Sequence, residues 1–91
     1  MTDHAGSARR SPTAEFLGPD AERGGPFALL GLSPTVERED EILAARERQM
    51  RRIDAHRLAE TPEADEVRLS LYAAAAQLLN PMIRAQLAVR W

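Results

Sequence analysis

The stretch that decides the fold is residues 61–83, TPEADEVRLSLYAAAAQLLNPMI. It opens with three signals of a helix start: a hydroxyl residue at the cap position, a proline at the first helical position and an acid in the first turn. The apolar residues that follow recur at steps of three and four and line one helix face: Val67, Leu71, Ala74, Ala75 and Leu78. Asn80-Pro81 repeats the cap-plus-proline start. The sequence therefore predicts a helix over 62–79 and another that begins at Pro81.

The final helix carries an apolar stripe to the last residue of the sequence. Ile83, Leu87 and Trp91 stand at positions i, i+4 and i+8. Two interpretations of Trp91 stay open: a core residue whose support lies beyond this sequence, or an anchor for a partner, since tryptophan is enriched at interface hot spots. The sequence also leaves open whether the chain is the front part of a longer protein, and what its oligomeric state is.

Upstream, residues 37–56 are predicted to form a second long helix. Acids crowd its first turns and Arg51 and Arg52 lie near its end, the polarity that the helix dipole favours. Its core positions recur at helical spacing: Ile42, Ala45, Gln49, Met50 and Ile53. A loop over 57–60 joins the two long helices, and helices with so short a connection pack antiparallel. The alanine run at 73–76 is interpreted as letting these helices approach closely.

A short helix is predicted to precede the hairpin. Pro26 can open it, Gly31 can close it with a left-handed residue, and a turn follows over 32–35. The predicted fold is all-α, with a short helix, an antiparallel hairpin of two long helices and a short C-terminal helix, together spanning residues 25–91. We expect one core made of Leu30, Ile42, Ile53, Val67, Leu71, Leu78 and Ile83.

Residues 1–24 are predicted to be a disordered N-terminal tail. The segment is rich in glycine, serine and proline, and Phe16 and Leu17 are its large apolar residues. Such a composition buries too little surface to offset chain entropy. A transient turn over residues 13–17 is the exception that we expect.

Composition excludes several function classes. Ninety-one residues make one small domain, and no cysteine is present for disulfides or thiolate metal sites. No apolar run approaches the ~20 residues of a membrane helix, so we expect a soluble, cytoplasmic protein. The net charge is −2, all 12 basic residues are arginines, and only four residues are aromatic. Nucleic-acid binders are usually basic and use aromatic stacking, so this balance argues against them.

No residues are placed to carry enzymatic chemistry. His56 stands two residues from Asp54, and residues two apart on a helix point to different sides. His4 and His56 are too few and too ill-matched for a metal site, and Gly24-Gly25 lacks the lysine and the preceding strand of a phosphate loop. We therefore expect no catalytic residue, no metal, no cofactor and no small-molecule substrate.

The order of these elements, with the residues at their joints, resembles the J-domain family. The matching positions are the opening Phe27-Ala28-Leu29-Leu30-Gly31, with one extra residue in its spacing, the Ser33-Pro34 turn, Ile42, Ala45, Leu78, Asn80-Pro81 and Arg84. The resemblance spans residues 26–88. It implies a J-like arrangement of the four helices, in which the basic second helix meets an acidic chaperone surface.

The resemblance fails at the part of the family that acts on chaperones. J-domains stimulate ATP hydrolysis by DnaK-type chaperones through a His-Pro-Asp tripeptide after the second helix, and that position reads Asp54-Ala55-His56 here. Without the proline the backbone restraint is lost. The carboxylate and the imidazole have also changed places, so a chaperone would meet each group on the wrong side of the loop. Arg46 and Gln49 also replace a core tyrosine and leucine of the family, which predicts a thin core in this helix.

An arginine-rich segment is the candidate interaction site. Five arginines against two acids give residues 46–57 a net charge of +3. The candidate partner-binding residues are Arg46, Arg48, Arg51, Arg52, Asp54, His56 and Arg57. In a second interpretation the segment is a solvated helix face whose arginines pair with acids of the next helix, which are Glu60, Glu63, Asp65 and Glu66.

The sequence thus predicts a non-catalytic adaptor that binds an unidentified protein partner with an acidic surface. It is not expected to stimulate a DnaK-type chaperone. Two alternatives stay open: a small regulatory domain that associates with nucleic acid through its arginine-rich helix, and a true DnaK-type co-chaperone.

Overall fold

The fold is all-α throughout residues 11–90, the part of the chain that the computed structural model describes. The described helices are α2 (Pro12–Leu17), α3 (Pro19–Arg23), α4 (Gly25–Leu30), α5 (Glu39–Asp54), α6 (Pro62–Leu79) and α7 (Pro81–Arg90). The prediction of an all-α chain is confirmed. The helix predicted over 37–56 is shorter, because Arg38 is still extended and Ala55 already leaves the helix.

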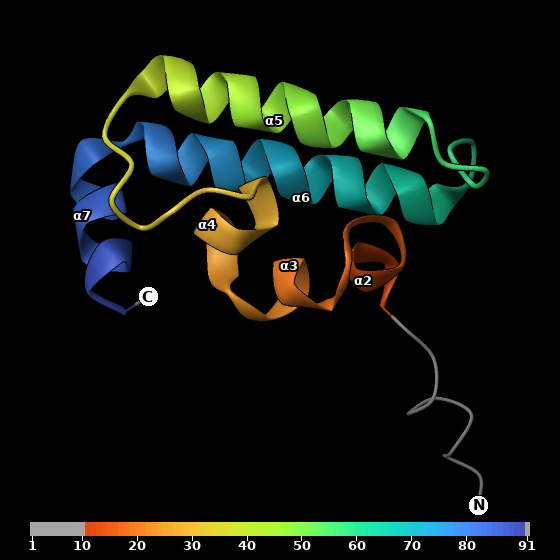
Figure 1. Cartoon of the computed structure of the whole chain (residues 1–91), viewed down its shortest axis with the longest axis horizontal. Coiled ribbons are helices and arrows are strands. Elements are labelled where there is room, and N and C mark those ends of the chain that lie inside the picture. The colour runs from red at the N-terminus through yellow and green to blue at the C-terminus, as the bar shows by residue number, and fades with distance from the viewer. Residues whose placement is uncertain (1–10, 91) are drawn as a thin grey trace, which may run out of the picture.

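Helices α5 and α6 lie side by side and antiparallel, and the other helices are arranged around α6 (Figure 1). The short helices α2, α3 and α4 form a row along the side of α6 that α5 does not cover. Helix α7 turns away at the end of α6. The loop between α5 and α6 therefore lies at one end of the molecule beside α2, and α7 lies at the other end.

The predicted helix boundaries are set by local capping. The Ala64 amide donates to Thr61 Oγ1 at 3.2 Å at the start of α6. Before α7, the amides of Met82 and Ile83 donate to Asn80 Oδ1 at 3.0 and 3.3 Å. Gly31 closes α4 with φ of 73°, a conformation that costs glycine little. Each of these caps confirms a signal read from the sequence.

Removal of the Thr61 hydroxyl is expected to destabilise the protein. Besides capping α6, Thr61 Oγ1 donates to the Leu58 carbonyl at 2.8 Å, so the same hydroxyl ties the loop to the helix start. We expect Thr61→Ala to lower the free energy of unfolding by about 1–2 kcal/mol, measured by urea denaturation. Thr61→Ser keeps the hydroxyl and should retain most of the stability. Equal losses in the two variants would contradict this role of the cap.

One hydrophobic core runs the length of α6. Six of the seven predicted core residues are at most 1% exposed: Leu30, Ile42, Ile53, Val67, Leu71 and Leu78. The prediction for Ile83 is wrong, since this residue is only half-buried and lies outside the core cluster. Because α7 turns away at Pro81, Leu87 and Ala88, further along the helix, pack against the core instead.

The prediction of a disordered tail over residues 1–24 is wrong for residues 11–24. Ser11 Oγ accepts the Ala14 amide at 3.2 Å and caps α2, whose Phe16 and Leu17 are 5% and 6% exposed. The segment is polar on average, but it contains the apolar pair Phe16 and Leu17 in α2, and this helix packs against α5 and α6. Residues 1–10 lie outside the described residues, and so does Trp91, whose role as core or anchor is therefore untested.

Gln49 does not thin the core of α5 as expected. It is 6% exposed, and its Nε2 donates to the Leu29 carbonyl at 2.9 Å. That carbonyl is in the last turn of α4, where helix carbonyls lack a partner within the helix. The Gln49 Oε1 accepts from Arg52 at 3.1 Å, so both ends of the amide are satisfied. Gln49 thus links α4 to α5 by a buried polar contact.

Candidate functional site

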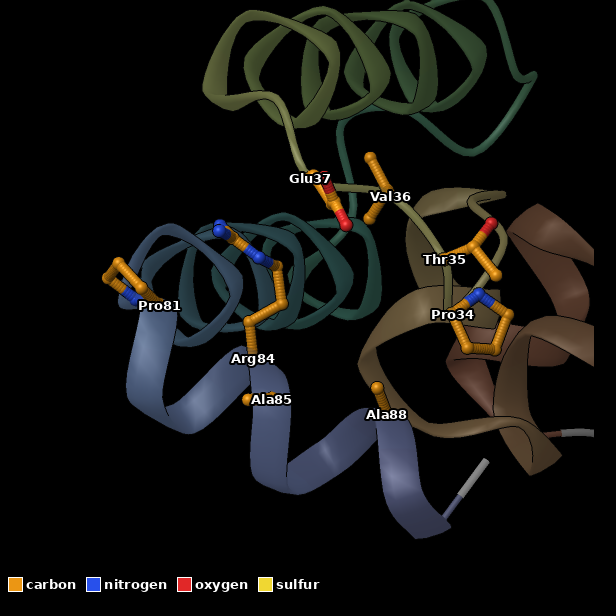
Figure 2. Close-up of a pocket in the computed structure, with 8 residues that line it drawn as sticks. All are labelled: Pro34, Thr35, Val36, Glu37, Pro81, Arg84, Ala85 and Ala88. Carbon is orange, nitrogen blue, oxygen red and sulfur yellow. The ribbon is translucent and has the colours of Figure 1, made fainter.

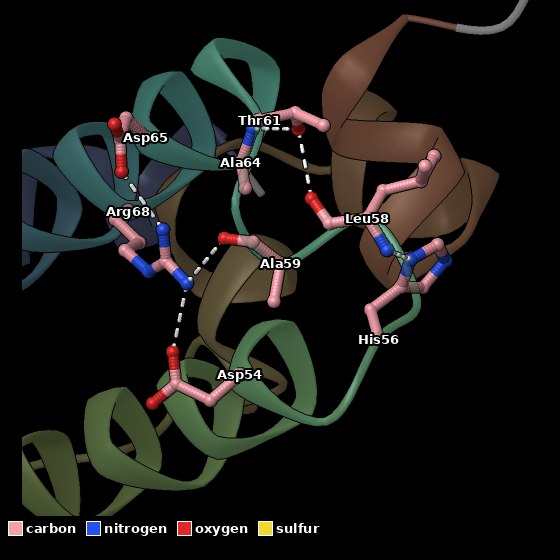
Figure 3. Close-up of polar contacts among 8 residues, drawn as sticks. All are labelled: Asp54, His56, Leu58, Ala59, Thr61, Ala64, Asp65 and Arg68. Atoms are coloured by element: carbon pink, nitrogen blue, oxygen red, sulfur yellow. Dashed lines mark hydrogen bonds and ion pairs between the residues drawn. The ribbon is translucent and has the colours of Figure 1, made fainter.

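A guanidinium connects the loop between α5 and α6 to both helices (Figure 3). Arg68, in the second turn of α6, reaches back across the hairpin. Its Nη2 donates to Asp54 Oδ1 and to the Ala59 carbonyl, both at 2.9 Å, and its Nη1 donates to Asp65 Oδ1 at 2.8 Å. One side chain therefore joins the end of α5, the middle of the loop and the start of α6.

The electrostatics of this contact favour a permanent charge. The hydrogen bond to Asp54, helped by that to Asp65, raises the pKa of Arg68 above its ordinary value. Arginine is already protonated in proteins under ordinary conditions. The cation that fixes the loop is therefore present at every pH at which the protein is ordinarily studied. Arg68 is missing from the candidate residues predicted from the sequence, because a contact across 14 residues leaves no local pattern.

Arg68→Lys should loosen the loop while leaving its charge in place. An ammonium is a point charge and cannot reproduce the fork that reaches three acceptors. We expect the amides of Ala59 and Thr61, which bond to His56 and Leu58 carbonyls, to exchange about tenfold faster or more, as for a lost bond to a charged group. Hydrogen exchange measured by NMR checks this.

Arg38→Lys, at the exposed pair with Asp40, is the control and should leave loop exchange unchanged. Unaltered protection in Arg68→Lys would contradict the anchor.

His56 is enclosed by its own loop and by α2. Its Nδ1 accepts the Leu58 amide at 3.1 Å, so the neutral ring carries its proton on Nε2. That nitrogen lies 4.0 Å from Glu15 Oε2, and the ring packs against Phe16 with centroids 4.5 Å apart. Asp54 faces Arg68 instead. The structure therefore does not bring Asp54 and His56 together as a base and its orienting carboxylate. Glu15 and Phe16 were missed from the sequence because they lie in the segment predicted to be disordered.

The arginines of the candidate site separate into two groups. Arg48, Arg51, Arg52 and Arg57 are exposed, and we call these four residues the arginine face. Within residues 11–90, none of the four forms an ion pair with an acid, and Arg52 donates only to Gln49. Arg46 is different. Its guanidinium lies 4.9 Å from the centre of the Tyr72 ring and 3.3 Å from Glu47, and its side chain is largely buried.

Of the second interpretation, the structure shows the solvated helix face but not the ion pairs, since within residues 11–90 none of these four arginines pairs with an acid of the next helix. Arg48, Arg51 and Arg52 are spaced i, i+3 and i+4, so they share a side of α5. Asp54 and Arg46, which contact Arg68 and Tyr72 of α6, lie on another side. The ion pair that crosses the hairpin has the opposite polarity, with the arginine on α6 and the acid on α5. The arginine face is therefore left facing solvent.

The hollow beside α7 does not assemble reactive groups. Its volume is about 480 Å³, and it lies between the α4–α5 connection and α7 (Figure 2). Its lining residues are Pro34, Thr35, Val36, Glu37, Pro81, Arg84, Ala85 and Ala88. Thr35 Oγ1 is hydrogen-bonded to Ser33 Oγ at 2.8 Å, and Arg84 donates to the Leu78 carbonyl at 2.8 Å. Thr35 and Arg84 thus support the turn and the end of α6.

Residues 11–90 were searched for groups of metal-ligating side chains and for membrane-spanning helices. This part of the chain has no group of three or more histidines and acids placed to hold a metal ion. Nor does it contain a helix that is both long and apolar enough to cross a bilayer. Comparison of the chain with protein-family models, with curated proteins and with solved structures gives no match.

Proposed function

We propose that the chain is a non-catalytic protein–protein interaction module with a J-like arrangement of helices. It docks on an acidic protein surface through the arginine face and does not stimulate a DnaK-type chaperone. The proposal rests on a difference between two sets of candidate residues, those that contact the rest of the chain and those that are exposed. The groups of Asp54 and His56 are used inside the chain, whereas the guanidiniums of the arginine face have no acidic partner among the described residues.

The order and packing of the helices support the J-like part of the proposal. The short α4, the antiparallel pair α5 and α6, and the terminal α7 follow one another as the family resemblance implies. Leu78 is fully buried, Asn80 caps α7, and Arg84 donates to the Leu78 carbonyl. These are the joints that carry the resemblance in the sequence.

The loop supports the loss of chaperone stimulation, because each position of the missing tripeptide has another task. Asp54 holds Arg68. The Ala55 amide donates to the Arg51 carbonyl at 3.0 Å, a bond that proline cannot make. His56 accepts from Leu58 and packs on Phe16. Replacement of residues 54–56 by His-Pro-Asp would break all three sets of contacts, so we expect that graft to restore little or no stimulation.

The test of this part is a single-turnover ATP hydrolysis measurement on a DnaK-type chaperone. The rate should be the same with and without the chain, while an ordinary J-domain, the positive control, accelerates it. Acceleration by this chain would mean that Asp54 and His56 can serve in place of the tripeptide. The proposal would then give way to the co-chaperone alternative.

The docking part is tested by measuring binding to two probes. Polyglutamate stands for an acidic protein surface, and duplex DNA tests the nucleic-acid alternative. The double variant Arg48→Glu/Arg51→Glu removes two cations from the arginine face. Arg23→Glu/Arg38→Glu makes the same change in net charge at exposed positions elsewhere. We expect the first variant to bind polyglutamate on the order of tenfold more weakly than the second, since charge complementarity is local. Equal affinities would overturn the assignment, and tight, steeply salt-dependent binding to DNA would favour the nucleic-acid alternative.

A further inference from the structure

From Leu69 onward, helix α6 is largely apolar on the side that faces away from the core. Of its alanine run, Ala74 and Ala75 are buried, whereas Ala73 and Ala76 are exposed. Leu69 and Tyr72 accompany them with 70% and 48% of their surface exposed. We call Leu69, Tyr72, Ala73 and Ala76 the outer stripe. A helix with one face in water normally carries charged and polar residues there, so such a stripe is typical of a helix with a partner.

The neighbouring helix extends this surface. Arg46 of α5 lies over the Tyr72 ring, and Leu43 stands one turn earlier on α5 with 40% of its surface exposed. Helices that run antiparallel place Leu43 toward the Ala76 end of the outer stripe. Leu43 thus adds an exposed apolar side chain on the neighbouring helix, and Arg46 and Glu47 supply polar groups beside Tyr72.

The order of large and small residues makes the outer stripe complementary to itself. If two copies of α6 cross antiparallel about the point between Tyr72 and Ala73, each Leu69 faces Ala76 of the second copy. Each Tyr72 then faces Ala73. Large side chains opposite small ones are what interdigitating helices require. A parallel crossing would instead place Leu69 against Leu69 and Tyr72 against Tyr72.

Charge disfavours the parallel orientation. Helix α6 begins with three acids, Glu63, Asp65 and Glu66. An antiparallel crossing separates the acidic starts of the two copies. A parallel crossing puts the acids of the two copies together, which costs free energy. The outer stripe thus fits a second copy of the chain in one orientation.

We propose that the chain self-associates through α6 into a two-fold symmetric, antiparallel dimer. Such isologous pairs are the commonest oligomers, because one self-complementary patch serves both subunits. A contact built on one helix pair is smaller than the ~1,200 Å² of a stable interface, so the dimer is expected to be weak and reversible. The proposal does not depend on the proposed function, because the arginine face lies on a different side of α5.

Sedimentation velocity over a concentration series tests the association. The chain should shift from monomer to dimer as its concentration rises, and Ala76→Glu should raise the dissociation constant about tenfold or more, since it places a charge in an apolar contact. Ala44→Glu makes the same change at an exposed site of α5 outside the outer stripe and should leave association intact. Arg48→Glu/Arg51→Glu should also leave it intact. A monomer at all concentrations, or equal effects of Ala76→Glu and Ala44→Glu, would overturn the proposal.

Cross-linking tests the orientation independently of any loss of affinity. The natural chain has no cysteine, so each introduced thiol is the only one. Under oxidising conditions a mixture of Leu69→Cys and Ala76→Cys chains should form mixed disulfides several-fold faster than either variant forms disulfides with itself. Faster pairing of each variant with itself would indicate a parallel crossing and would contradict the proposed dimer. Circular dichroism should show unchanged helicity in both variants, because both positions are exposed.

Discussion

Leu71→Ala should lower the free energy of unfolding by about 2–5 kcal/mol. Leu71 has no exposed surface and lies at the middle of α6, which packs on both α5 and α4. Truncation removes apolar contacts on both sides and leaves a cavity that rigid neighbouring helices cannot close. Domains of ordinary size are stable by only about 5–15 kcal/mol, so the loss is a large share of the total. Equilibrium denaturation in urea, followed by circular dichroism, measures it.

Leu69→Ala is the matched control, because it makes the same chemical change two residues earlier on the same helix. Leu69 is 70% exposed, and surface substitutions usually change stability by no more than about 0.5 kcal/mol. Both variants should be compared at low protein concentration, where self-association through Leu69 contributes nothing. Equal losses at the two sites would mean that α6 is rotated from the register described.

Phe16→Ala should have an effect of similar size, about 3–5 kcal/mol. Phe16 is 5% exposed and packs against the His56 ring, so it fastens α2 to the loop at the end of the hairpin. A helix of six residues does not persist without tertiary contacts. The amides of Glu15 and Gly18, which bond to carbonyls of residues 11 and 14, should therefore lose their protection from hydrogen exchange.

Phe16→Leu separates apolar volume from the aromatic contact. A leucine keeps much of the buried volume, and swaps between large apolar residues usually cost less than about 1.5 kcal/mol. We expect α2 to remain protected in this variant. If α2 kept its full protection in Phe16→Ala as well, the docking of residues 11–24 would not depend on the contact with the loop.

The elements predicted well are those whose capping residues or apolar spacing can be recognised within a short stretch of sequence. Thr61-Pro62 and Asn80-Pro81 placed the starts of α6 and α7 correctly, and the spacing of Ile42, Val67 and Leu71 identified the core. The same cap-plus-proline signal stands at Ser11-Pro12, where α2 begins. The polar composition of the whole segment hides it. Helices of five or six residues are too short to display a period, so capping is the only local evidence that they leave.

The candidate site was predicted only in part, because its decisive contacts join residues far apart in the chain. Exposure of the arginine face follows from helical spacing. The reach of Arg68 to Asp54, the packing of Phe16 on His56 and the bond from Gln49 to Leu29 do not. Each depends on how helices meet in three dimensions. A polar residue such as Gln49 at a core position was the one hint, since buried amides need partners.

The packing of α2 on the loop has a consequence for how this sequence can change. Contacting residues have non-additive substitution effects, so replacements at Phe16 and His56 should compensate or aggravate one another. A chain that has lost Phe16 has already lost the ring contact at His56, so a later replacement of His56 costs it less. The freedom of His56 to vary therefore depends on α2, a helix about 40 residues nearer the N-terminus.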